Sequence, residues 1–186
     1  MINSYDALQI LLWNELMDIL GADKSKTPAV RHSWPIHGAP DWKITDDVIF
    51  MQLAEVEDDV NIPLDGQWRD AERDLVYRQG ITRVFELRLN AYGPDCYDNL
   101  LHIRLAFLNG RPNLRKQNVC IVPERTGIIK APELFQSRWW NRADTRMKFN
   151  VLMVFDQDVK TIETVNITVL GNKVPTTITV QKSDKD

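Results

Sequence analysis

The chain has 186 residues, of which 44% are hydrophobic and 26% charged, and its formal net charge is −3. This is the composition of an ordinary globular protein with enough apolar residues for a core, so we expect one domain over residues 1–186. The slight negative charge argues against general electrostatic binding of nucleic acid, and no apolar run approaches the roughly 18 residues needed to cross a bilayer.

The first expected element is a helix over about Ser4–Leu20. Apolar residues recur there at spacings of three and four, which places them on one face: Tyr5, Leu8, Leu12, Leu16 and Ile19. Ser4 or Asn3 can cap its start, and Gly21 suits the left-handed position after a helix. Residues 22–47 contain prolines and no stable period, so we expect an irregular arm there.

A strand is expected over Val48–Val56, followed by a second irregular arm over about 61–74. Leu75–Tyr77 and Thr82–Ala91 then predict either a strand pair or one bent strand around Gly80. The alternation of apolar and polar residues after Thr82 is typical of a half-buried antiparallel strand.

Gly93-Pro94-Asp95 ends this strand and opens a helix that runs to about Asn109. Proline fixes φ and suits the first turn of a helix, while an acidic residue favours its N-terminus. The apolar positions that we expect this helix to bury are Tyr97, Leu100, Leu101, Leu105 and Leu108.

The last third of the chain predicts three strand regions separated by loops. Val119–Val122 is a short strand, 126–141 is a loop with apolar anchors, and Asp144–Asp156 is a long alternating strand. Residues 161–186 are expected to form a C-terminal hairpin that reverses at Gly171-Asn172 and ends in a mobile polar tail.

These elements predict an α+β fold in which two helices pack on one face of a mainly antiparallel sheet, with long loops or arms. The expected structural anchors of this fold are Phe85, Leu87, Leu101, Trp139 and Phe149. Tryptophans in polar, irregular segments favour contacts with partners, because such rings supply large contact areas. The expected interface residues are Trp34, Trp42, Trp68 and Trp140. For the adjacent pair Trp139-Trp140, anchoring a loop is favoured over stacking on a sugar or base.

Nucleophiles and metal ligands do not form a convincing site in the sequence. Cys96 opens a helix without a base nearby, Cys120 is far from it, and His102 lies mid-helix among core positions. The loop residues His32, His37 and Asp41 could hold a metal, but their spacing differs from common ligand patterns. Acidic clusters occur around 46–47, 55–59 and 70–72, where nearby arginines favour a solvated surface over a catalytic site. We therefore expect no catalytic residue, metal or cofactor.

Two passages resemble the phage neck and tail terminator family. RVFELRLNAYGPDCYDNLLHIRLAF resembles that family's strand, AYGP turn and helix, and SRWWNRADTRMKFNVLMVF resembles its second hallmark, an aromatic entry into a long strand. TIETVNIT is similar to the terminal strand that follows. The matching wording covers about residues 75–169, while SWPIHGAPDW agrees in order only.

The resemblance implies a structural virion protein that forms a ring, typically a hexamer, on the head-proximal end of the tail tube. It implies contacts with the tube protein, with a neck connector or head-completion protein, and with a sheath protein where the tail contracts. Genomic DNA would pass through without sequence-specific binding, and the protein would occupy the virion after assembly in the host cytoplasm. Another neck component, the tube cap of a tail-like contractile particle, and a small metal-dependent hydrolase are the alternatives.

Overall fold

The computed structural model describes residues 2–22, 29–34, 41–61, 66–71, 74–123, 127–159, 164–170 and 175–181. The chain divides into two compact units, the first formed by Met1–Asp65 and Gly80–Phe155 and the second by Gly66–Gln79 and Asp156–Asp186. That all 186 residues form a single domain stays a prediction. No helix among the described residues is both long and apolar enough to cross a membrane.

Three helices belong to the first unit. Helix α1 spans Tyr5–Ile19, and the Ser4 side chain caps it by accepting a hydrogen bond from the Ala7 backbone N–H at 3.2 Å. Helix α2 spans Cys96–Leu108, and helix α3 is a five-residue turn over Pro112–Lys116. Both long helices lie where the sequence predicts them, and Gly21 after α1 has the expected positive φ of +61°.

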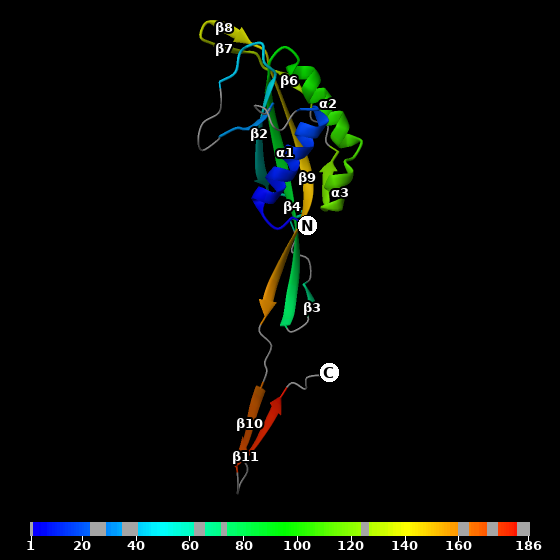
Figure 1. Ribbon diagram of the computed structural model, residues 1–186, viewed down its shortest axis with the longest axis vertical. Helices are drawn as coiled ribbons and strands as arrows, with labels where there is room; N and C mark the ends of the chain where they lie inside the picture. The colour runs from blue at the N-terminus through cyan, green and yellow to red at the C-terminus, as the bar shows by residue number, and fades with distance from the viewer. Residues whose placement is uncertain are drawn as a thin grey trace. The chain divides into compact units, whose positions relative to one another are not determined.

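The main sheet of the first unit has the strand order β1-β2-β4-β9-β5 (Figure 1). Its strands are β1 (Val30–His32), β2 (Val48–Val56), β4 (Asp74–Tyr92), β5 (Val119–Val122) and β9 (Arg142–Val159). Strand β1 pairs parallel with β2, whereas β2 pairs antiparallel with β4 and β5 antiparallel with β9. The expected bent strand around Gly80 is thus one continuous strand, β4, and the long C-terminal strand is β9.

Three short strands occupy the segment that we expected to be a loop. Strand β6 (Ile129–Lys130) pairs with β9, and β7 (Glu133–Phe135) forms a hairpin with β8 (Arg138–Trp140). Two short strands also lie inside the expected irregular arms, namely β1 and β3 (Gln67–Ala71). These strands are two to five residues long, too short to show a clear hydrophobic period.

In the second unit, β3 pairs antiparallel with the first residues of β4. Strand β10 (Thr164–Leu170) pairs antiparallel with β11 (Pro175–Gln181), which places a hairpin where the sequence predicts one. The reversal at 171–174 and the tail at 182–186 lie outside the described residues.

One core joins both long helices to a single face of the sheet. Alternate strand residues face it, because successive side chains of a strand point to opposite sides. Phe85, Leu87 and Phe149 are 3% exposed or less. The α1 and α2 residues in the same core are Leu8, Leu12, Leu16, Met17, Ile19, Cys96, Leu100, Ile103 and Phe107. This arrangement confirms the predicted α+β class with helices on one face of a mainly antiparallel sheet.

Helix α2 buries a different stripe from the one expected. Leu100 is fully buried, but Leu101, Leu105 and Leu108 are 39%, 50% and 43% exposed. Successive residues of a helix are separated by about 100°, so the helix carries two apolar stripes side by side. The core takes one of them, and Leu101 is therefore not a core anchor.

Candidate functional site: the open sheet face and its hairpin

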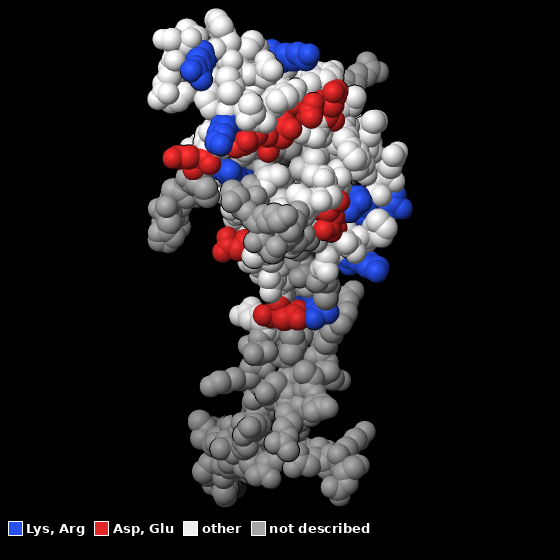
Figure 2. Space-filling view, turned by 45° about the horizontal axis from the view of Figure 1, so that its top comes forward, with Lys and Arg blue, Asp and Glu red and all other residues white. Residues whose placement is uncertain are grey.

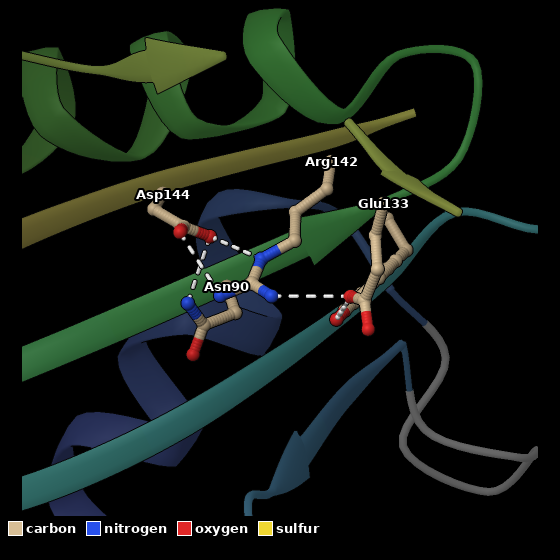
Figure 3. A network of polar contacts seen from close by, with 5 residues as sticks. Asn90, Glu133, Arg142 and Asp144 are labelled. Carbon is tan, nitrogen blue, oxygen red and sulfur yellow. Dashed lines mark hydrogen bonds and ion pairs between the residues drawn. The ribbon is translucent and has the colours of Figure 1, made fainter. Parts of the chain in front are cut away.

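The sheet face opposite the helices carries a polar network centred on Arg142. Its guanidinium donates to both carboxylate oxygens of Asp144, at 2.8 and 3.0 Å, and to Glu133 Oε2 at 3.1 Å (Figure 3). The Asn90 side-chain amide donates to the same Asp144 carboxylate at 2.8 Å. Since Asn90 lies on β4, Arg142 and Asp144 on β9, and Glu133 on β7, the network joins the hairpin to the centre of the sheet.

Tyr92 extends this network, and its surroundings shift the pKa of its hydroxyl. Its hydroxyl donates to Glu133 Oε2 at 2.8 Å, and the Arg142 guanidinium lies 5.7 Å from its ring centroid. Burial first, and the hydrogen bond to Glu133 second, raise the pKa of Tyr92 to about 12. The hydrogen bonds to Asp144 raise the pKa of Arg142 as well. Because these groups are paired with one another, their role is to hold the hairpin on the sheet. We refer to them as a clamp.

An aromatic cluster supports the base of the hairpin on the same face. Trp42 lies 5.1 Å from Phe50, 6.0 Å from Tyr92 and 6.1 Å from Trp140, measured between ring centroids. The Phe135 ring is 6.1 Å from Trp140. Edge-to-face contacts of this kind contribute about 0.5–1.5 kcal/mol each beyond area burial. A hollow of about 620 Å³ opens beside the cluster, lined in part by Trp42, Tyr92 and Trp140.

The hairpin itself is a short finger, defined here as residues 133–140. Gln136 and Ser137 form its two-residue turn with φ of 48° and 59°, the positive values that the favoured tight hairpin turns require. Leu134 faces Trp139 across the hairpin, and these side chains are 57% and 67% exposed. Phe135 is 54% exposed. The finger therefore presents apolar side chains to solvent on a backbone that is clamped at its base.

The structure separates the four tryptophans expected at interfaces. Trp34 is 76% exposed. Trp42 and Trp140 are half-buried in the aromatic cluster, and the side chain of Trp68 lies outside the described part of the chain. Trp139, which we expected to anchor the fold, projects from the finger, while Trp140 packs inward. Adjacent strand residues face opposite sides, so one of the pair had to be exposed, but the sequence alone does not say which.

The chemical candidates are dispersed. The Gln9 amide nitrogen lies 2.6 Å from His32 Nδ1, and His102 is exposed on α2. Cys96 is buried, which raises the pKa of its thiol and disfavours the reactive thiolate. His37 lies outside the described residues. Among the residues that the structure does describe, no three His, Cys, Asp or Glu side chains gather in a way that could hold a metal ion.

Acidic side chains gather where α2 begins. The Asp47 carboxylate accepts a hydrogen bond from the Asp95 backbone N–H at 3.0 Å, and Asp46 lies beside it. Burial, and then the neighbouring carboxylates, raise the pKa of Asp47 against the effect of that hydrogen bond. In the view of Figure 2, acidic side chains form a band across the upper part of the molecule, with separate basic side chains above it. Such a surface disfavours contact with phosphate groups.

Comparison with known proteins assigns the family. A family model described as phage neck terminator protein matches residues 6–173, which includes α1 except its first residue, all of α2, the main sheet and the finger. A search of curated protein sequences finds no match. The matched span exceeds the stretch on which the sequence resemblance rests and covers nearly the whole chain. The chain therefore belongs to the phage neck terminator protein family.

Proposed function

We propose that this protein terminates phage tails by forming a ring, as a homohexamer, on the head-proximal end of the tail tube. The ring stops the addition of tube subunits and presents the surface that joins the head. Membership of the phage neck terminator family supports this role. That family is structural, and its members are components of the virion neck.

The observation that carries the proposal is the finger. Leu134, Phe135 and Trp139 are all more than half exposed, and they sit on a hairpin that the Arg142 network clamps to the sheet. Large apolar side chains on a rigid projection are typical of a surface that another protein covers. A terminator needs such surfaces for its own copies, for the tube protein, and for the neck connector or head-completion protein.

The role in DNA passage follows from charge. In this role the ring joins a DNA-filled head, so genomic DNA would pass through it during ejection. A strongly basic lumen would hold the phosphate backbone by releasing its counterions. The net charge of −3 favours a conduit that DNA passes without sequence-specific binding. A sheath protein would join the partners where the tail is contractile.

The test mixes purified protein with tail tubes and then adds free tube subunits. We expect negative-stain microscopy to show extra density at one end of each tube and no further growth at that end. Tubes that lengthen as fast as tubes without the protein, and that carry no cap, would refute the proposal. Binding to DNA-filled heads with no binding to tubes would identify the protein as a head-completion component instead.

Trp34 offers a matched test of one capping contact. Its side chain is 76% exposed, so Trp34→Ala is expected to leave the subunit folded and to weaken capping. Ile10→Ala is the control, because Ile10 is also largely exposed, at 60%, but lies on helix α1. Equal capping by the Trp34 variant and wild type would remove Trp34 from the contact surface.

A further inference from the structure

The finger and helix α2 carry two apolar surfaces that fit one another. We infer that the ring is closed by a head-to-tail contact in which the finger of one copy packs on the leucine stripe of the next. The leucine stripe is defined as Leu101, Leu105 and Leu108 on α2. This inference rests on the proposed ring and names its subunit contact.

The finger supplies the projecting half of the contact. Leu134 and Trp139 are cross-strand partners, so their side chains lie next to each other on one side of the hairpin. Trp139 is 67% exposed, which leaves roughly 150 Å² of its surface uncovered, given the usual area of a tryptophan side chain. Tryptophan is among the residue types that most often dominate the binding energy of a protein interface, and here its side chain is exposed on a projecting hairpin.

The leucine stripe supplies the receiving half. Leu101, Leu105 and Leu108 are spaced by four and three residues, so they line one side of α2. Each is between 39% and 50% exposed, while Leu100, Ile103 and Phe107 on the neighbouring side fill the core. The stripe is therefore held rigidly by the buried side of its own helix. It forms a shallow apolar surface against which a flat aromatic ring can lie.

Charge agrees with this pairing. Arg138 is exposed on the finger directly before Trp139. Asp98 is exposed on the first turn of α2, three residues before Leu101, and Asp95 and Asp46 are exposed close by. Arg138 pairs with Phe135 and faces the other side of the hairpin from Trp139, so the opposite charges act between the two surfaces as a whole and form no direct ion pair in this contact. Opposite charges on two surfaces speed their association.

The positions of the two surfaces favour a second copy of this chain as the partner. Both belong to the first unit, and Figure 1 shows the β7–β8 hairpin and α2 on different sides of the sheet. One subunit cannot join its own finger to its own stripe across the sheet. A contact between two different surfaces of identical subunits is heterologous, and it generates a closed ring when the rotation closes. Each copy then gives one finger and receives one.

The decisive experiment uses two variants that damage opposite halves of the contact. Trp139→Glu places a charge on the apolar surface of the finger and leaves the stripe intact. Leu105→Glu places a charge on the stripe and leaves the finger intact. Both positions are at least half exposed, so both variants should fold, as circular dichroism and thermal melting can verify. We expect each variant alone to self-associate about thirtyfold more weakly than wild type in light scattering.

The mixture of these variants gives the sharpest result. One good finger and one good stripe remain in each mixed pair, so a one-to-one mixture should form dimers that grow no further. Ile10→Glu, a change at an equally exposed position on α1, should still form rings. Rings from either damaged variant alone, a mixture that stays monomeric, or a wild type that is monomeric at every concentration tested would each overturn the inference.

Charge reversal checks the role of the opposite charges, and cross-linking checks the orientation of the contact. Arg138→Asp and Asp98→Arg should each slow assembly, and the effect should shrink at high salt, because the charges act at long range. In a Cys120→Ser background, mixing Leu134→Cys with Leu105→Cys should yield disulfide-linked dimers that neither variant yields alone. Linkage within a sample of Leu134→Cys alone would instead indicate a symmetrical finger-to-finger contact and refute the head-to-tail contact.

Failure of this contact can be distinguished from failure of the proposed function. If the Trp139→Glu variant forms normal rings but does not cap tubes, the finger binds the tube, so the inference fails while the terminator role stands. If wild-type rings depend on finger and stripe but never cap tubes, the contact stands while the terminator role fails.

Discussion

Leu100 and Leu101 are neighbours on α2 with opposite environments, and replacing each by alanine separates core packing from surface exposure. Leu100 is fully buried, whereas Leu101 is 39% exposed. Both changes remove the same atoms, and leucine and alanine have similar helix propensities, so the intrinsic effect on the helix nearly cancels. Leu100→Ala should lower the free energy of unfolding by about 2–5 kcal/mol, because it leaves a cavity among core side chains.

Leu101→Ala should lower the free energy of unfolding by only about 1 kcal/mol, because solvent and relaxing side chains fill the space. For a chain of this size, 1 kcal/mol shifts Tm by about 2–4 °C. We therefore expect Tm to fall by about 10 °C for Leu100→Ala and about 3 °C for Leu101→Ala. Urea denaturation of dilute protein measures the two losses of unfolding free energy without interference from self-association. Equal losses, or a larger loss for Leu101→Ala, would refute the assignment of the buried stripe.

Three further changes test other parts of the fold. Arg111→Met should lower stability by about 3 kcal/mol in urea denaturation, because Glu15 is 1% exposed and loses the guanidinium that lies 2.5 Å away; adding Glu15→Gln should recover part of that loss. Tyr92 keeps its proton to about pH 12 in the folded state and releases it near 10 when unfolded, so its stabilisation is present below pH 10 and is lost as pH rises through 12. Stability measured across that interval should fall more for wild type than for Tyr92→Phe, and parallel curves would contradict this. Gly93→Ala should lower Tm through a loss of roughly 1–3 kcal/mol, since φ is +113° and an added Cβ would lie 2.4 Å from a carboxylate oxygen. Gly21→Ala, with a φ of +61° but nothing within 4 Å, should lower it less.

The long elements could be predicted because each buries one face over many residues. In β9, Met147, Phe149 and Val151 alternate with polar or charged residues, and this period fixes both the strand and its buried side. Helix α1 combines a cap, an apolar stripe and a terminal glycine, three independent signals of the same structure. Agreement between local signals and tertiary packing explains why the fold class follows from the sequence.

The finger could not be predicted because its strands are held by tertiary contacts. Strands β7 and β8 have three residues each, and their turn uses Gln136 and Ser137 where a sequence signal would need glycine or asparagine. The clamp that fixes the hairpin joins Glu133 to Arg142, and their pairing depends on the strand positions. Without that register, nothing distinguishes Trp139 from Trp140, and the expected roles of the two rings were exchanged.

The error on α2 has a different cause, which bears on function. Periodicity identifies apolar residues that share a side, but it does not say whether that side meets the protein's own core or another subunit. Leu100, Ile103 and Phe107 form one stripe, and Leu101, Leu105 and Leu108 form the other. A monomeric protein would have little reason to keep the second stripe apolar, because its exposure favours aggregation. In a protein that works as an assembly, a partner is expected to cover the second stripe. Leu101, Leu105 and Leu108, which the sequence pattern assigned to the core, are therefore the first residues to test for a contact between subunits.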